Sequence, residues 1–393
     1  MTKQMQLNAY LKTKCPTLTT DLSGYVISPF HLQLPESVLT QAKKSVEAFF
    51  RLRNNPTYQA YVNEQRPNLE VKKNYAVLMS YDFHLTENGL KMIEINTNAS
   101  SSLLFAYLYE MENLKELGTS PFLNQIHQSF KEELQLCSMN TEGVNAWIMD
   151  EDPAHQKMYV EFQLYQQLMK SWGWHAEIVD TKTWSTKKDV DLDQKKDAVQ
   201  MIYNRSTDFY FDKSPFLKNL YHSGRVCFSP NPHEYSLLAD KQRMIDMSLK
   251  TNHEKWGMSA EDSEILLQVL PESYDSSHTE LEVLWEKRKN LFFKPKSSYG
   301  GKAAYRGSSI SRKAFEAMPK GEFLAQEYIT APSIEAYCDK ARLGVEADLQ
   351  EYKFDLRFYA YQDQIQLAGA RVFKGQLTNF REPHSGLATI DFQ

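Results

Sequence analysis

A group of oxygen-bearing side chains occupies a predicted hairpin in residues 81–100, YDFHLTENGLKMIEINTNAS. Asn88-Gly89 is a strong signal for the turn. A two-residue Asn-Gly loop would place Asp82 and Glu94 on opposite faces. A three-residue loop that ends in a bulge at a left-handed Gly89 instead pairs Asp82 directly with Glu94. We predict the second register.

In that register Asn96 lies on the same face as Asp82 and Glu94, and Ile93 and Ile95 point into a core. Two carboxylates and an amide oxygen form a hard-oxygen site, which suits Mg²⁺ and not zinc. The alternative is a polar strand face in contact with solvent. The preceding segment YAVLMSY is too apolar for a strand on the surface. The hairpin is therefore predicted to hold a metal through these three side chains.

A second stretch, FFKPKSSYGGKAAYRG at 292–307, has the composition of a phosphate-binding loop. Paired glycines let backbone N–H groups approach phosphate oxygens closely, and a lysine could reach the α- and β-phosphates. The stretch lacks the GxxxxGK[ST] spacing, so it predicts no Walker-type site. A basic hairpin tip on the surface is the alternative. If the stretch does bind phosphate, its candidate nucleotide-binding residues are Lys294, Ser297, Ser298, Gly300, Gly301 and Lys302.

Four further segments, at 237–244, 323–330, 352–361 and 369–386, carry side chains suited to a nucleotide. The end of an apolar strand at 323–330 could bind an adenine edge through backbone groups and ribose hydroxyls through a carboxylate. An alternating segment at 352–361 sets Asp355 and Arg357 on one face, and Arg is a natural partner of a γ-phosphate. Taken alone, each segment could be an ordinary strand end, a surface ion pair or a solvated lysine. The candidates are Gln326, Glu327, Tyr328, Ile329, Arg357, Arg371, Asn379 and, at a helix start, Lys241.

The composition is that of a globular protein of 393 residues, 42% apolar and 24% charged, which is enough for two or three domains. A net charge of -5 disfavours a general nucleic-acid binder. The longest apolar run, at 103–109, is too short to span a membrane, and the first residues lack a signal-peptide core. Four cysteines without zinc spacing indicate reduced thiols. We therefore expect a cytoplasmic protein without nucleic-acid or membrane partners.

The elements that would position these residues fall into four parts. Residues 1–70 are predicted as an N-terminal helical segment. Residues 71–140 contain the metal-ligand hairpin and a following helix. Residues 141–232 alternate between strand and helix, a βαβ pattern that implies a parallel sheet. Residues 233–393 begin with helices, end with strands and carry the nucleotide-binding segments.

The order of these segments is more specific than any one of them. ADK, FFKPKSSYGG, AQEYI, DLR and GARVFKGQLTN resemble the successive nucleotide-site elements of the ATP-grasp superfamily, the fold of glutathione synthetase and D-alanine–D-alanine ligase. Those enzymes end in an aspartate strand and a Glu-x-Asn motif that hold magnesium. Here the matching residues are Asp82 and Glu94-Ile95-Asn96, near the front of the chain.

The sequence therefore resembles a circularly permuted ATP-grasp protein, as in the glutathionylspermidine synthetase-like group. The resemblance implies an α/β (α+β) fold in which residues 71–140 and 233–393 form the ATP-grasp domain. A Rossmann-like pre-ATP-grasp domain would occupy 141–232, and the helical segment 1–70 would precede it. Permutation is physically tolerable because chain termini commonly lie at the surface and close together.

The resemblance implies an ATP-dependent ligase that joins a carboxylate to an amine or a thiol through an acyl phosphate. In that scheme Lys241 and Lys294 hold the α- and β-phosphates, the 297–302 loop lies over them, and Glu327 takes the ribose. Arg371 would stabilise the acyl phosphate and its tetrahedral successor.

The resemblance also assigns two Mg²⁺ ions to Asp82, Glu94 and Asn96, where they bridge the β- and γ-phosphates of ATP. Arg357 would assist at the γ-phosphate, unless Asp355 is its structural partner. The implied cofactors are therefore ATP and Mg²⁺.

The implied substrates are a small molecule or peptide with a carboxylate, and an amine acceptor. A phosphotransferase on the same fold and a catalytically inactive nucleotide-binding scaffold are the alternatives. The oligomeric state stays open, with a homodimer as one alternative. Candidate residues for the acceptor site are His84, the segment 96–102, Arg205, Arg381 and His384.

Overall fold

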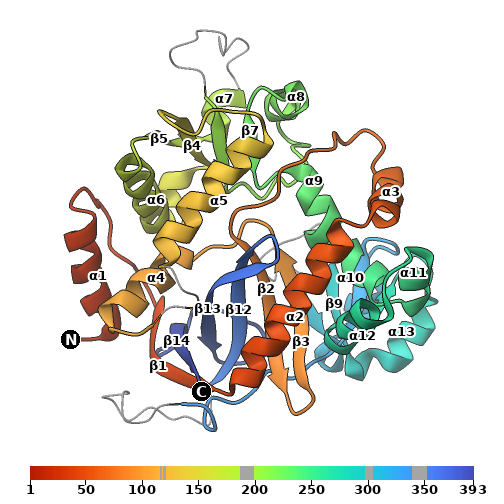
Figure 1. Ribbon diagram of the computed structural model, residues 1–393. Helices are drawn as coiled ribbons and strands as arrows, with labels where there is room; N and C mark the ends of the chain where they lie inside the picture. Colours follow the sequence, from red (N-terminus) through yellow and green to blue (C-terminus); the bar gives the residue numbers. More distant parts are fainter. Residues whose placement is uncertain (116, 118–120, 186–198, 297–303, 339–351) are drawn as a thin grey trace.

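The computed structural model describes residues 1–115, 117, 121–185, 199–296, 304–338 and 352–393. Three sheets form the framework, and helices pack around them (Figure 1). None of the helices in these ranges is both long enough and apolar enough to cross a bilayer. The α-helices are α1 (Lys3–Lys14), α2 (Glu36–Arg53), α3 (Pro56–Gln65), α4 (Ser102–Met111), α5 (Phe122–Leu136), α6 (Tyr159–Ser171), α7 (Thr181–Ser185), α8 (Pro215–Ser223), α9 (Pro232–Glu234), α10 (Lys241–Met247), α11 (Lys250–Lys255), α12 (Ala260–Val269), α13 (Leu281–Lys287) and α14 (Arg312–Glu316).

A six-stranded sheet combines strands from both ends of the chain. Its order is β1-β14-β13-β12-β2-β3, and all neighbours are antiparallel except the parallel pair β1 and β14. The predicted hairpin therefore joins, through β2, the strands of the C-terminal part. The strands are β1 (Ile27–Leu34), β2 (Met79–Thr86), β3 (Gly89–Asn96), β12 (Lys353–Tyr361), β13 (Gln364–Phe373) and β14 (Gly386–Phe392).

Helices cover both faces of this sheet. Figure 1 shows α2 crossing in front of it, and α2 packs on β3, β13 and β14 through an apolar stripe that includes Val46 and Phe49. α4 packs on β13 and β14 and belongs to a separate apolar cluster. A Cβ atom at Gly369 of β13 would lie 2.2 Å from the ring of Phe105 on α4, so glycine is needed for this close packing.

The prediction that residues 1–70 are helical is wrong for residues 27–34. This segment forms β1, which pairs with β14 at the other end of the chain, so Leu32 lies opposite Ile390. The pairing is non-local, and a helical stripe that begins directly after it dominates the local pattern. α1, α2 and α3 account for the helical part of the prediction.

A parallel four-stranded sheet of order β5-β4-β6-β7 lies within residues 141–232, as the βαβ pattern implied. It is seen at the top of Figure 1, with α5 and α6 packed beside it. The division of the chain into four domains at the predicted boundaries stays a prediction. The strands are β4 (Asn145–Asp150), β5 (His175–Asp180), β6 (Met201–Asn204) and β7 (Cys227–Ser229).

A third, antiparallel sheet of order β10-β9-β11-β8 lies on the right of Figure 1, next to the hairpin and to α10. A π-helical turn, Tyr235–Ala239, leads into α10. The strands are β8 (Ser273–Asp275), β9 (Leu291–Pro295), β10 (Tyr305–Arg306) and β11 (Phe323–Glu327). Lys294, on β9, and the end of β11 therefore belong to one sheet, which is separate from the hairpin sheet.

The hairpin has the predicted pairing of Asp82 with Glu94, but its turn differs from both registers considered. Thr86 pairs with Gly89, so the loop is two residues long, and the bulge lies at Ile93. Gly89 has φ +93° and lies against Gln41 of α2, whose Oε1 accepts a 2.8 Å hydrogen bond from the next backbone N–H. The packing of α2 thus fixes the turn. Because of the bulge, Ile93 is partly exposed, not buried.

Candidate functional site

A cavity of about 330 Å³ lies between the six-stranded sheet and the small antiparallel sheet. One wall comes from β3 and the end of β13, and the other from β9 and β11. The sequence-predicted residues that line it are His84, Glu94, Lys241, Lys294, Gln326, Glu327, Tyr328, Ile329, Arg371, Asn379 and Arg381. Residues from opposite parts of the chain are thus brought to one cavity, as the order of the motifs required.

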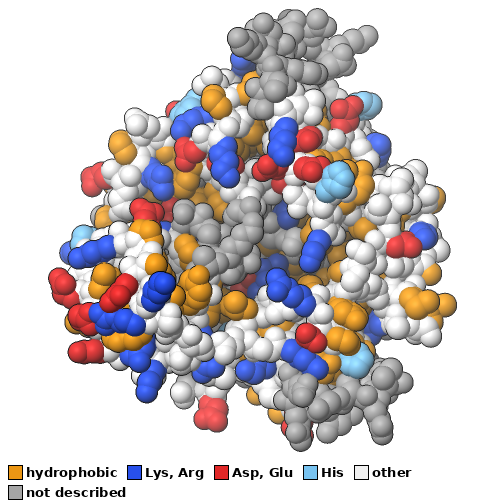
Figure 2. Space-filling model, turned by 180° about the vertical axis from the view of Figure 1, so that it is seen from behind, with side chains coloured by type: hydrophobic (Ala, Val, Ile, Leu, Met, Phe, Trp, Pro, Cys, Tyr) orange, Lys and Arg blue, Asp and Glu red, His pale blue; other side chains and the backbone are white. Residues whose placement is uncertain are grey.

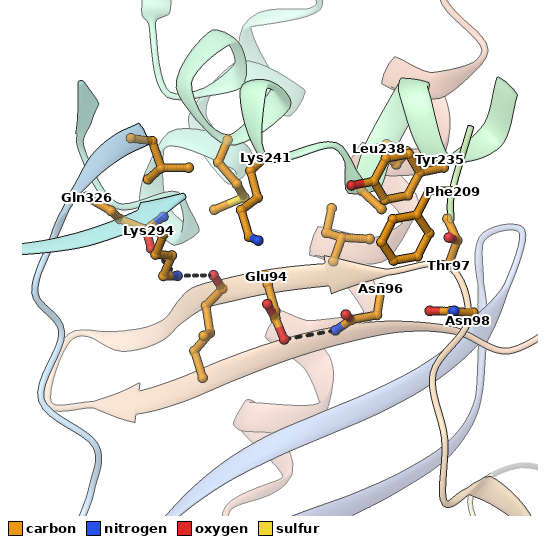
Figure 3. A pocket seen from close by; sticks show the side chains of 15 residues that line it. Glu94, Asn96, Thr97, Asn98, Phe209, Tyr235, Leu238, Lys241, Lys294 and Gln326 are labelled. Carbon is orange, nitrogen blue, oxygen red and sulfur yellow. Dashed lines mark hydrogen bonds between the residues drawn. The ribbon is translucent and has the colours of Figure 1, made fainter. Parts of the chain in front are cut away.

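A smaller hollow of about 40 Å³ adjoins this cavity. Glu94, Lys241 and Lys294 line both spaces and so mark their junction. Figure 3 shows the side chain of Lys241 pointing toward the strand that carries Glu94, with Lys294 of β9 lying further along that strand and the Glu94 carboxylate directed toward Asn96. The hollow continues from this junction past Asn96 to Thr97.

The two lysines bring positive charge to the junction. The ammonium group of Lys294 donates to the carbonyl oxygen of Ile93 at 3.0 Å and to Oε1 of Gln326 at 2.8 Å. Burial, together with the neighbouring charge of Lys241, lowers the pKa of Lys294 to about 8, although the negative charge of Glu94 acts in the opposite direction. Burial also lowers the pKa of Lys241. Both groups would gain from an anionic ligand, which would compensate their desolvation.

Glu94 and Asn96 present oxygen atoms to the junction. Nδ2 of Asn96 donates to Oε1 of Glu94 and to Oδ2 of Asp82, both at 3.2 Å. The amide nitrogen thus faces the two carboxylates, and Oδ1 is the amide atom left to face a cation. One carboxylate and one amide oxygen fit a single Mg²⁺ ion, whose other positions water and ligand phosphates usually fill.

The predicted role of Asp82 as a metal ligand does not fit its surroundings. Asp82 is fully buried and lines neither cavity. Its oxygens accept from Nε and Nη2 of Arg357 at 2.8 and 2.6 Å, and Nη2 of Arg371 lies 3.0 Å from Oδ2. Burial would raise the pKa of Asp82, but the two guanidinium groups lower it below its ordinary value. Among the residues that the structure describes, no group of three potential acidic, His or Cys ligands could hold a metal ion.

Strand register explains this arrangement. Asp82 lies opposite Arg357 across the β2–β12 pair, and Asp355 lies opposite Arg371 across the β12–β13 pair. Arg371 accordingly donates from Nε to Asp355 at 2.7 Å. Asp355 is thus the partner of Arg371, and Arg357 is paired with Asp82. Arg371 lines the large cavity, whereas Arg357 does not, so the predicted catalytic role of Arg357 lacks a route to the ligand.

The end of β11 forms the far side of the large cavity. Nδ1 of His84 donates to the carbonyl oxygen of Ile329 at 2.9 Å, and burial lowers the pKa of this histidine, which favours its neutral form. Phe292 and Tyr328 add aromatic surface, and Glu327 is exposed. Flat apolar surface beside backbone polar groups and a carboxylate suits a nucleoside.

The remaining predicted residues differ in where they lie relative to the two cavities. Ser297, Ser298, Gly300, Gly301 and Lys302 lie outside the described residues. Arg381 lines the large cavity. Nη1 of Arg205 donates to the carbonyl oxygens of Asn98 and Ala99, so it supports the segment after β3. Nδ1 of His384 lies 3.2 Å from the hydroxyl of Tyr352, and His384 is not among the residues that line either cavity.

The smaller hollow also contains residues that the sequence did not single out. Phe209 and Tyr235 stack with centroids 4.1 Å apart at its far end, beside Thr97 and Asn98 (Figure 3). The hydroxyl of Thr97 is buried and has no hydrogen-bond partner among the described residues. Phe209 and Tyr235 are 26 positions apart in a region without a motif, so no sequence signal could have found them.

Figure 2 shows the molecule from behind, with Lys and Arg side chains around the centre of this face. This gathering contrasts with the net charge of -5 for the whole chain. A local excess of positive charge attracts anions even when the net charge is negative.

No protein-family model and no curated protein sequence matches the chain. Among solved structures, it is similar to a glutathione synthetase-like effector from Globodera pallida in its apo form, with a TM-score of 0.64 and 12% identity over 100% of this chain and 96% of that one. A candidate gamma-glutamylcysteine synthetase from Methylobacillus flagellatus KT gives a TM-score of 0.48 and 13% identity over 92% and 90%. The first likeness shows the fold alone. It confirms the predicted mixed α/β fold, which is similar to that of the glutathione synthetase-like effector and is consistent with an ATP-grasp-like fold.

Proposed function

We propose that this protein is an ATP-dependent ligase that joins a carboxylate to an amine, or to a thiol, through an acyl phosphate. The observation that supports this most directly is the junction of the two cavities, where two partly buried lysines face Glu94. A triphosphate in the large cavity would place negative charge beside the two lysines. A metal ion held by Glu94 would lie where the large cavity meets the smaller hollow. The ATP-grasp-like fold is consistent with the proposal.

The large cavity takes the nucleotide. The base lies between Phe292 and the end of β11, where Glu327 reaches the ribose hydroxyls. Lys241 and Lys294 bind the α- and β-phosphates as point charges, and Gln326 keeps Lys294 in place through their 2.8 Å hydrogen bond. The γ-phosphate then lies close to Glu94.

Glu94 and Asn96 would hold one Mg²⁺ ion, and not the two that the sequence implied, because Asp82 is engaged by arginines. When bound, the ion would neutralise charge on the β- and γ-phosphates. Arg371, held by Asp355 and Asp82, carries a fixed positive charge at the wall of the cavity. There it would stabilise the anionic acyl phosphate without reorganising.

The smaller hollow takes the second substrate. It begins at Glu94 and ends at Thr97 and the stacked pair Phe209 and Tyr235. A nucleophile bound there would approach the acyl carbon from the side away from the nucleotide. Attack forms the amide or thioester bond and breaks the bond between the acyl carbon and the phosphate oxygen, and inorganic phosphate leaves while the nucleophile gives up one proton. The protein itself contributes position and charge.

The test is ADP release by the full chain with Mg²⁺-ATP and a panel of amino acids, small peptides and polyamines, added singly and in pairs. Release that needs both a carboxylate and an amine supports the ligase. Hydroxylamine added with the carboxylate alone should give an acyl hydroxamate. ADP release with a stable phosphorylated product and no hydroxamate would instead identify a phosphotransferase.

One observation favours a second candidate, a nucleotide-binding scaffold without turnover. Among the described residues, Glu94 is the carboxylate that faces the junction, since Asp82 is paired with two arginines. A protein of this kind would bind ATP by calorimetry and release no ADP with any substrate pair.

A further inference from the structure

Two of the four cysteines, which are far apart in the sequence, meet in the fold. Sγ of Cys137 lies 2.8 Å from Sγ of Cys227, although 90 positions separate them. Cys137 directly follows α5, and Cys227 is the first residue of β7. Both are free thiols. A disulfide bond is about 2.05 Å long, so a shift of less than about 1 Å would join the two sulfurs.

The surroundings hold the two sulfurs in place. The backbone N–H of Cys137 and the thiol of Cys227 both donate to the carbonyl oxygen of Glu133, at 3.0 and 3.4 Å. Nδ2 of Asn74 donates to the Glu133 carboxylate and to the carbonyl oxygen of Phe228, both at 2.9 Å. The end of α5 and the start of β7 are thus fastened to each other by backbone and side-chain hydrogen bonds.

The pair can also be reached by a small reagent. Cys137 is partly exposed and lines a cavity of about 240 Å³, together with Lys73, Asn74 and Phe228. Cys227 is fully buried beneath it, and burial raises the pKa of its thiol. A reagent would therefore meet Cys137 first, and Cys227 would react second.

We infer that Cys137 and Cys227 form a reversible disulfide, with a low-molecular-weight disulfide as the oxidant. The Cys137 thiolate attacks one sulfur of the reagent and releases one small thiol, which takes up the proton that Cys137 lost. The Cys227 sulfur then attacks Sγ of Cys137 and releases the second small thiol, which takes the Cys227 proton. Two protein thiols are oxidised and one small disulfide is reduced to two thiols.

The bond would link α5 to the edge strand of the parallel sheet. It closes a loop of about 90 residues, so it restricts the unfolded chain more than the folded one. The residues that line its cavity are not shared with the two cavities of the proposed nucleotide site. The inference therefore stands apart from the proposed function.

The test treats the full native chain with 2-hydroxyethyl disulfide, blocks the remaining thiols with iodoacetamide in denaturant, and maps peptides by mass spectrometry without reduction. The number of alkylated cysteines should fall from four to two, with one linked peptide pair that contains residues 137 and 227. Cys338→Ser, a change at another partly exposed cysteine, should leave this link intact. Cys137→Ser should abolish it.

Thermal unfolding gives a second measurement that needs no variant. The oxidised wild-type chain should unfold at a temperature on the order of 5 °C higher than the same sample with dithiothreitol. Four alkylated cysteines after exposure to excess reagent would overturn the inference. So would a stable mixed disulfide on Cys137, or a link to Cys15 or Cys338.

Discussion

Raising the pH from 7 to 9 is expected to weaken nucleotide binding through the charge of Lys294. Its pKa lies near 8 because its ammonium group is partly desolvated between β9 and β3. Below that value the group is charged and attracts phosphate, and above it the group is neutral. Bound phosphate stabilises the charged form, so the pKa rises in the complex and binding takes up a proton.

The size of the effect follows from the titration. With a pKa near 8, about 0.9 of the molecules carry a charged Lys294 at pH 7 and about 0.1 at pH 9. If only the charged form binds tightly, the apparent affinity falls about tenfold, which is about 1.4 kcal/mol. At pH 8, binding should take up about half a proton per nucleotide.

Isothermal calorimetry with a non-hydrolysable ATP analogue and Mg²⁺ measures both quantities. Titrations at pH 7, 8 and 9 give the affinities, and repeats at pH 8 in HEPES and in Tris give the proton uptake, because the two buffers differ in ionisation enthalpy. Lys294→Arg should flatten the pH profile, since arginine stays charged. Lys296→Met is the matched control, because Lys296 pairs with Asp275 and lines neither cavity.

Two outcomes would refute this reasoning. Equal affinity at pH 7 and pH 9 would mean that Lys294 does not bind the phosphates or is not titrating in this range. An unchanged pH profile in Lys294→Arg would assign the titration to another group, of which Lys241 is the nearest candidate.

Three further predictions concern the residues around Glu94. Glu94→Gln should lower the rate of Mg²⁺-dependent ADP formation on the order of 100-fold or more while the chain stays folded. The control is Glu87→Gln at the exposed turn of the same hairpin, which should leave the rate unchanged. Comparable rates in the two variants would contradict the role of Glu94 as a metal ligand. Asp82→Asn should lower the free energy of unfolding by about 3–5 kcal/mol in urea titrations, because the buried Arg357 and the partly buried Arg371 lose a charged partner. Unchanged stability with lost Mg²⁺ dependence would instead return Asp82 to the metal site. Thr97→Val should leave the free energy of unfolding within about 1 kcal/mol of the wild-type value, because the hydroxyl has no hydrogen-bond partner among the described residues. The same change should raise KM for the second substrate with little change in kcat. A stability loss with an unchanged KM would place Thr97 in the core and not in the substrate site.

The features that could be predicted from the sequence are those that local spacing determines. Alternation along the hairpin gave the correct pairing of Asp82 with Glu94, even though the turn was placed wrongly. The turn itself depends on Gln41, which reaches Gly89 from a helix that precedes it by almost fifty residues. The common cavity for Glu94 and Lys294 followed from the family resemblance, not from either segment alone.

Pairings between distant segments could not be predicted from the sequence. Asp82 is predicted as a metal ligand from its hairpin and from the family resemblance, and neither takes account of its ionic partners. Its ionic partners come from β12 and β13, whose register with β2 the local sequence does not specify. The same limit applies to β1, which a distant parallel strand stabilises, and to Phe209 and Tyr235, which meet only through the tertiary fold.

The six-stranded sheet also has a consequence for biosynthesis. On the ribosome β1, β2 and β3 emerge first, yet 275 positions separate Asp82 from Arg357 and 358 separate His31 from Thr389. The early strands therefore wait with open edges until β12, β13 and β14 have been translated. Long-range pairing of this kind slows folding, and uncovered strand edges favour association with other chains. We expect the nascent chain to depend on chaperones until its last strands leave the exit tunnel.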